Sequence, residues 1–86
     1  MDTNPQTYGL SLRIELQKIE DNHIAIVKLI KSRIIQKDAK KILEIAKRLQ
    51  HVKPSIKVSL ICTPNICSKS LSLLKREGIA CILIED

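Results

Sequence analysis

Apolar and polar residues alternate strictly over residues 10–17, near the start of the chain. The apolar positions all have even numbers: Leu10, Leu12, Ile14 and Leu16. A period of two over eight residues is typical of a strand with one buried face. The turn residues Glu20-Asp21-Asn22 come next, so the following apolar stretch is expected to form a hairpin with this strand.

That second stretch, residues 24–30, is apolar at every position except Lys28. A short run without alternation predicts a central strand that is covered on both sides. The pattern then changes to helical spacing over residues 36–50, with one apolar stripe made by Ile35, Ala39, Ile42, Leu43, Ala46 and Leu49. Pro54 cannot continue a helix, so the helix is expected to end before it.

The last third of the chain predicts a strand, a short helix and a final strand. Residues 56–62 are expected to form a second buried strand, and Pro64-Asn65 the turn after it. The helix is expected to begin at residue 67 or 68 and to end at residue 77. Gly78 is then the residue just past the helix, in a left-handed conformation, and residues 79–84 form the last strand.

The order of elements, β-β-α-β-α-β, predicts an α/β fold in which a mixed sheet is flanked by two helices. The last three strands are expected to be parallel, joined by right-handed crossovers. A chain of 86 residues makes one such domain and leaves no room for a second core. The polar stretch around Asn4-Pro5 predicts a flexible N-terminal tail over residues 1–8, so the domain is expected to cover 9–86.

Several short motifs follow one another in a fixed order along these elements. Arg13-Ile14-Glu15-Leu16 lies on the first predicted strand, and Pro64-Asn65-Ile66-Cys67 follows the third. Leu71, Leu73-Leu74 and Gly78-Ile79 complete the second half without a gap. These motifs resemble the core of restriction-endonuclease-like (PD-(D/E)xK) nucleases, especially archaeal domains of the NucS and RecB types. The resemblance covers about three-quarters of the chain.

The resemblance implies which positions would hold the nuclease chemistry. The family's metal-binding Asp and Glu correspond to Glu15 and Leu29, its Lys to Lys31, and its helix Gln to Ile42. Such enzymes hold divalent ions with at least two carboxylates, and leucine offers no oxygen ligand. The resemblance therefore implies a scaffold that has lost its metal site, with no cofactor and no catalytic residue. An alternative is that Glu15 and Lys31 are ordinary residues of a polar strand face.

The formal charge of +6 is distributed unevenly. Residues 1–27 sum to −2 and residues 58–86 to zero, whereas residues 28–57 carry ten Lys or Arg against Asp38 and Glu44. A segment with a net charge of +8 is typical of a surface that binds the phosphates of duplex DNA. The residues expected to bind are Lys31, Arg33, Lys37, Lys40, Lys41, Lys47 and Arg48. A solvated helix face is the alternative explanation.

The sequence contains no helix-turn-helix, zinc-finger or RNA-binding motif, and Tyr8 is its single aromatic residue. Base stacking therefore has no platform, and we expect a non-catalytic nucleic-acid-binding protein that contacts phosphates. One alternative is a small interaction subunit that forms a homodimer through its edge strand, or that binds a nuclease or DNA-repair protein. Another is an active metal-dependent nuclease in which Glu44 or Asp38 joins Glu15.

The three cysteines, Cys62, Cys67 and Cys81, form no CxxC pair and lie far in sequence from either histidine. Buried or half-buried thiols are therefore expected rather than a metal site. A Cys62–Cys81 disulfide between neighbouring strands would require a disulfide-tolerant cytoplasm. Residues 1–9 lack the apolar segment of a signal peptide. No apolar run approaches the roughly 18 residues of a membrane span. A cytoplasmic protein without membrane contact is expected.

Overall fold

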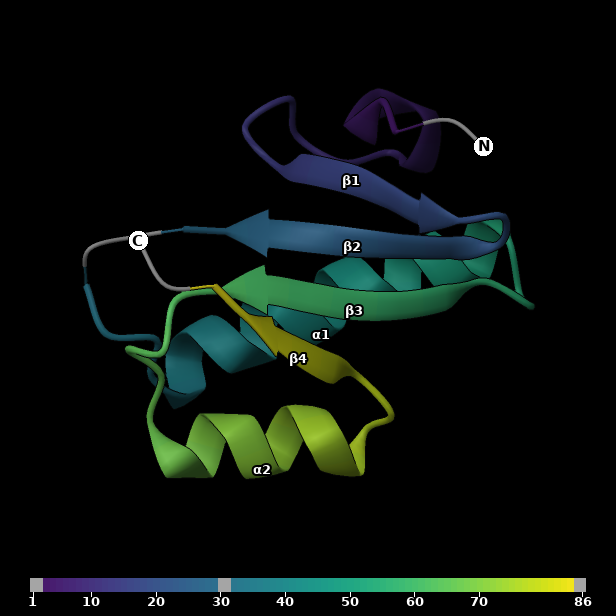
Figure 1. Cartoon of the computed structure of the whole chain (residues 1–86). Helices are drawn as coiled ribbons and strands as arrows, with labels where there is room; N and C mark the ends of the chain where they lie inside the picture. The colour runs from purple at the N-terminus through teal and green to yellow at the C-terminus, as the bar shows by residue number, and fades with distance from the viewer. Residues whose placement is uncertain (1–2, 30–31, 85–86) are drawn as a thin grey trace.

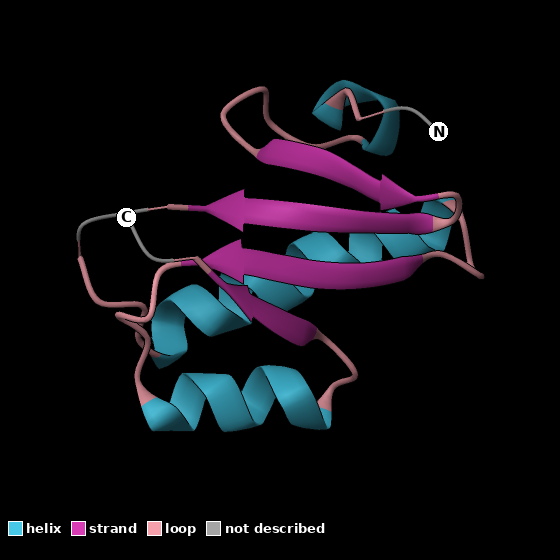
Figure 2. Cartoon of the chain, viewed as in Figure 1, coloured by secondary structure: helices cyan, strands magenta, loops and turns pink. Residues whose placement is uncertain are grey.

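The structure is a computed structural model that describes residues 3–29 and 32–84. Its elements, coloured by type in Figure 2, follow one another as a 3-10 helix η1 (Pro5–Tyr8), β1 (Glu15–Glu20), β2 (His23–Lys28), α1 (Gln36–Val52), β3 (Lys57–Cys62), α2 (Ser68–Arg76) and β4 (Ala80–Leu83). After the 3-10 helix, this is the predicted order of strands and helices, and the α/β class is confirmed.

The four strands form one mixed sheet in the order β1-β2-β3-β4. β1 pairs with β2 in antiparallel orientation, whereas β2, β3 and β4 are parallel, as predicted. The two helices contact each other, and α1 passes behind β2 and β3 in Figure 1. The connections β2-α1-β3 and β3-α2-β4 both run in the same direction across the sheet. Because the two crossovers have the same handedness, both helices lie on one face of the sheet.

The core lies between the sheet and these helices. The even-numbered residues of β2 and β3 face it, among them Ile24, Ile26 and Leu60. The helix stripe predicted from spacing meets them with four buried side chains: Ala39, Ile42, Ala46 and Leu49. Ile35, the first member of that stripe, is instead half exposed because it is the residue just before α1.

No helix covers the opposite face of the sheet within the part of the chain that the structure describes (Figure 1). This differs from the prediction that residues 24–30 are covered on both sides. The centre of β2 is buried even so, because Ala25 is small and lies beside Ser59 of β3, which is also buried. On the same face Ile61 is buried between Val27 and Ile82, its partners on the two adjacent strands.

The first strand begins at Glu15 and not at Leu10, so the prediction of a strand over residues 10–17 was wrong in its first half. Gly9 has φ 72°, and a turn follows in which the Ile14 N–H donates to the Ser11 carbonyl at 3.1 Å. This turn interrupts the alternation and leaves Leu12 67% exposed. The apolar period of two therefore arises partly from a loop.

Pro5–Tyr8 form η1, whereas a flexible tail was predicted for residues 1–8, of which residues 1 and 2 lie outside the described residues. Pro5 fixes the first helical φ of η1, and the Gln6 N–H donates to the Asn4 side chain at 3.1 Å. Tyr8 is 4% exposed and joins the core. Burying this aromatic side chain stabilises the segment against the domain.

Two turns place the strands that follow them. Asn22 has φ 67° in the hairpin between β1 and β2, and its side-chain amide donates to the Ser55 carbonyl. Gly78 has φ 82° just past α2, as its spacing predicted. The Ile79 N–H donates to the Leu74 carbonyl at 2.9 Å, and the Gly78 N–H to the Lys75 carbonyl at 3.1 Å. This pair of bonds is a Schellman motif, and it turns the chain directly into β4.

Candidate nucleic-acid interface

Five cationic side chains share the outer face of α1. Helical geometry places them within an arc of about 120°, centred opposite the buried stripe. All five are exposed: Lys37, Lys40, Lys41, Lys47 and Arg48. We call this set the α1 cation face. The helix has this orientation because its apolar stripe must face the sheet, so the charges on the other side are left in water.

The α1 cation face has almost no internal compensation. Glu44 is the single acidic residue at its centre, where it borders a shallow hollow with Lys47, Arg48 and His51. The described residues, 3–29 and 32–84, contain one ion pair, in which Lys18 Nζ lies 3.2 Å from Asp21 Oδ1. This pair lies on the hairpin of β1 and β2. The cations of α1 therefore remain available to an anionic partner.

The two remaining cations of the predicted interface, Arg33 and Lys31, do not belong to the α1 cation face. Arg33 is exposed in the segment before α1, close enough to the Cys67 thiol to lower its pKa. The larger causes of that lowered pKa are hydrogen bonds from the Ser70 side chain and backbone. Arg33 is thus near the start of α2 and is not part of the α1 cation face. Lys31 lies outside the described residues.

The positions that the nuclease resemblance assigns to metal binding come together at one end of β1 and β2. Glu15 pairs with Val27, and Leu29 follows the end of β2. Glu15, Val27 and Leu29 line a common hollow of about 270 Å³. Both Glu15 and Leu29 are exposed. The hollow thus has one carboxylate from this pair of positions, where two would be needed to hold a divalent ion.

Neither helix carboxylate supplies the missing ligand. Asp38 accepts a hydrogen bond from the Ile35 N–H at 3.1 Å and so caps the start of α1. Glu44 points away from the sheet with the α1 cation face. In the described part of the chain, no group of three His, Cys, Asp or Glu side chains is placed to hold a metal ion. The alternative of an active nuclease with migrated ligands gains no support from this geometry.

One polar pair could not be predicted from the sequence. His23 Nε2 and Ser59 Oγ are 2.6 Å apart, on the sheet face opposite the helices. A serine beside a histidine is a nucleophile candidate, but Ser59 is 1% exposed. The hydroxyl is therefore closed to a substrate, and the bond links β2 to β3. Finding the pair requires the parallel register of these strands, and no local motif shows that register.

The three thiols are free; Cys62 is buried and Cys67 and Cys81 are half-buried, as the sequence predicted. Burial, and then the nearby Cys81, raise the pKa of the Cys62 thiol to about 11. Burial also raises the pKa of Cys81. Cys67 has the opposite environment, because its sulfur accepts the Ser70 N–H at the start of α2. The pKa is thus raised for Cys62 and Cys81 and lowered for Cys67.

Comparison of the chain with protein-family models, with curated proteins and with solved structures gives no match. Among the described residues, no helix has both the length and the apolar character needed to cross a bilayer.

Proposed function

We propose that the chain is a non-catalytic nucleic-acid-binding protein that contacts the phosphates of duplex DNA through the α1 cation face. The observation that carries this proposal is the exposure of five cations on one side of one helix, with one carboxylate among them. A solvated face without a ligand is the competing explanation, and it requires no binding at all.

The dimensions of the helix suit a duplex. From Lys37 to Arg48 the helix rises about 16 Å. A duplex carries one phosphate charge per about 1.7 Å of its axis, so this span faces enough phosphates to engage all five cations. The single aromatic side chain, Tyr8, is buried and cannot stack on a base. Contacts of this kind give affinity without sequence preference.

The non-catalytic part of the proposal combines the nuclease resemblance with the hollow at Glu15 and Leu29. We infer a degenerate restriction-endonuclease-like core in which the sheet is retained and the second carboxylate is replaced by an apolar side chain. Support comes from the placement of both positions on the same hollow. The order of strands and the parallel crossovers are consistent with that inference.

The test is a comparison of charge-reversal variants by fluorescence anisotropy on a mixed-sequence DNA duplex. Lys40→Glu with Lys41→Glu should weaken binding about 10- to 100-fold near 0.1 M salt, to a similar degree on unrelated sequences. Lys18→Glu with Lys57→Glu is the matched control, because it changes the net charge equally on β1 and β3. Equal losses for both double variants would show that net charge, and not the α1 cation face, determines binding.

A further inference from the structure

The second surface of interest is the outer edge of the sheet at β4, which we call the β4 edge (residues 80–84). Three neighbouring apolar side chains are exposed there: Ile82 at 39%, Leu83 at 48% and Ile84 at 41%. None of residues 79–84 is charged. The opposite edge, β1, carries Glu15, Lys18 and Glu20. Charges of that kind discourage a strand from pairing with another chain, and the β4 edge lacks them.

The backbone of the β4 edge presents hydrogen-bonding groups to an incoming strand. The Ile84 N–H donates to the Cys62 carbonyl of β3 at 2.8 Å. Because the backbone alternates along a strand, Ala80 and Ile82 also direct their N–H and C=O groups toward β3. Cys81 and Leu83 therefore direct theirs away from the sheet. Two residues with outward donor and acceptor groups are what a further antiparallel strand requires.

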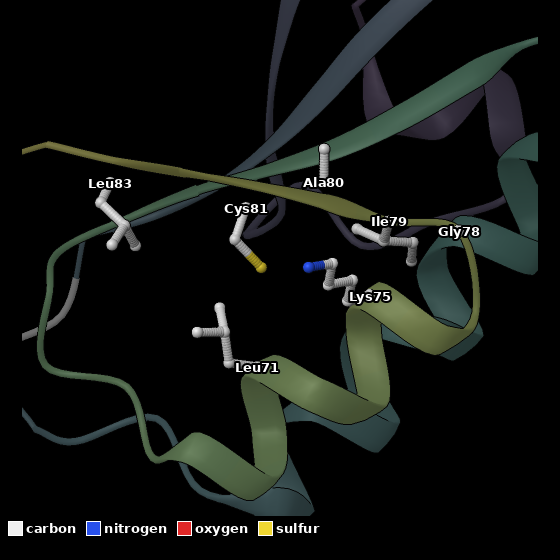
Figure 3. A pocket seen from close by; sticks show the side chains of 7 residues that line it. All are labelled: Leu71, Lys75, Gly78, Ile79, Ala80, Cys81 and Leu83. Carbon is white, nitrogen blue, oxygen red and sulfur yellow. The ribbon is translucent and has the colours of Figure 1, made fainter.

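A groove runs between this edge and α2. Its volume is about 520 Å³, and its walls include Leu71 from α2 and Ile79, Cys81 and Leu83 from the β4 side. Figure 3 shows the Leu71 and Cys81 side chains pointing into the space between helix and strand, and the Lys75 amine extending into the same space beside Cys81. An apolar side chain that entered from beyond the edge would contact these walls and leave water.

We propose that β4 pairs in antiparallel orientation with β4 of a second copy of this chain, about a two-fold axis at Ile82. In this register Cys81 lies opposite Leu83 of the second copy, and the outward groups of both residues form four hydrogen bonds. Leu83 of the second copy then projects on the helix side, into the groove beside Cys81. The two Ile82 side chains meet across the axis on the other face.

Symmetry and charge favour a second copy over a different partner. An antiparallel pair of identical strands is self-complementary, so each groove receives the same leucine that the other provides. The pairing brings no like charges together along residues 79–84. It also joins the apolar row of Val27, Ile61 and Ile82 to the same row of the second copy. A strand pair alone is smaller than the roughly 1,200 Å² of a stable interface, so the filled grooves are part of the proposal.

Molar mass in solution gives the first test. Light scattering should give about twice the 9.7 kDa of one chain. Leu83→Pro removes one outward N–H and no bond to β3, so this variant should have the mass of one chain and the far-ultraviolet circular dichroism of the wild type. Leu12→Lys is the control, because it removes another exposed leucine far from the β4 edge, and it should remain a dimer. If the wild-type protein has the molar mass of one chain at 0.1 mM, the proposal is overturned.

Cross-linking tests the register. In a chain whose native cysteines are replaced by alanine, Ile82→Cys should oxidise rapidly to a covalent dimer, because facing residues at the axis have Cα atoms within disulfide range. Ala80→Cys and Ile84→Cys should each cross-link slowly alone and rapidly when mixed, because they lie opposite each other. Rapid cross-linking of Ala80→Cys alone, with slow cross-linking of Ile82→Cys, would contradict this register.

Discussion

The α1 cation face and the β4 edge are both exposed, and they differ in the chemical groups that they present to a partner. The α1 cation face exposes five positive charges, with one carboxylate among them, on the surface of a helix. The β4 edge exposes apolar side chains and directs backbone groups away from the sheet, and residues 79–84 carry no charge. The first surface suits a polyanion and the second suits a strand. A domain of one sheet and two helices thus separates its electrostatic surface from its apolar one.

Both surfaces depend on one core, and a substitution in that core tests this dependence. Leu74 of α2 is fully buried between the helix and the sheet. Leu74→Ala should lower the free energy of unfolding by about 2–5 kcal/mol, because removing this side chain leaves an enclosed cavity in the core. Urea denaturation measures the change, and Leu12→Ala, at a 67% exposed site, should change it little. A small loss at Leu74 would mean that α2 and the β4 edge are not coupled to the core.

The turn at Gly78 joins α2 to β4 and so positions the β4 edge, whereas α1 lies earlier in the chain and does not depend on it. Gly78 has φ 82°, and an added Cβ would meet no atom within 4 Å. The cost of Gly78→Val is therefore backbone strain alone, about 1–2 kcal/mol of unfolding free energy. Thermal denaturation should show a lower Tm for Gly78→Val than for Gly78→Asn, since asparagine tolerates the left-handed region. Equal Tm values for both variants and the wild type would contradict this account of the turn.

The hollow at Glu15 and Leu29 is a third surface, and a substitution there tests the inference that it once held a metal ion. Leu29→Glu would place a second carboxylate on the hollow and should raise Mn²⁺ affinity measurably by calorimetry, with Leu29→Gln as the uncharged control. Its stability cost should stay below about 1 kcal/mol, because Leu29 is 55% exposed. Tight Mn²⁺ binding by the wild type would contradict the degenerate-nuclease inference.

The smallest effect concerns the end of α2 where Arg33 approaches. Cys67 has a lowered pKa, whereas burial raises the pKa of Cys62 to about 11. At pH 8 iodoacetamide should alkylate Cys67 at least about tenfold faster than Cys62, because the thiolate reacts. Mass spectrometry of the peptides measures the ratio. Ser70→Ala removes the largest cause of the lowered pKa and should slow Cys67, and a rate unchanged by it would contradict the assigned hydrogen bond.

The sequence predicts the elements wherever pattern and turn chemistry agree. The stripe on α1, the break after it and Gly78 past α2 all rest on local rules, and the structure has all three. The prediction was wrong at Leu10–Ile14, because a turn there imitates strand alternation. The structure also differs at Tyr8, whose burial depends on contacts with distant segments.

The candidate surfaces follow a similar division. Spacing alone predicts that the cations of α1 share one face, because helical periodicity is local. The β4 edge and its groove could not be predicted in this way, because they depend on the order of strands and on which amides face β3. The His23–Ser59 bond could not be predicted from the sequence for the same reason, because it depends on the parallel register of β2 and β3.

The salt dependence of DNA binding by the wild-type protein tests whether the α1 cation face binds phosphates. A plot of the logarithm of the association constant against that of the salt concentration should have a slope of about −4 to −5, as expected when five cations displace counterions from a duplex. The same plot for Lys40→Glu with Lys41→Glu should be flatter by about two. A wild-type slope near zero, or no binding at 50 mM salt, would contradict the assignment of the α1 cation face to phosphates.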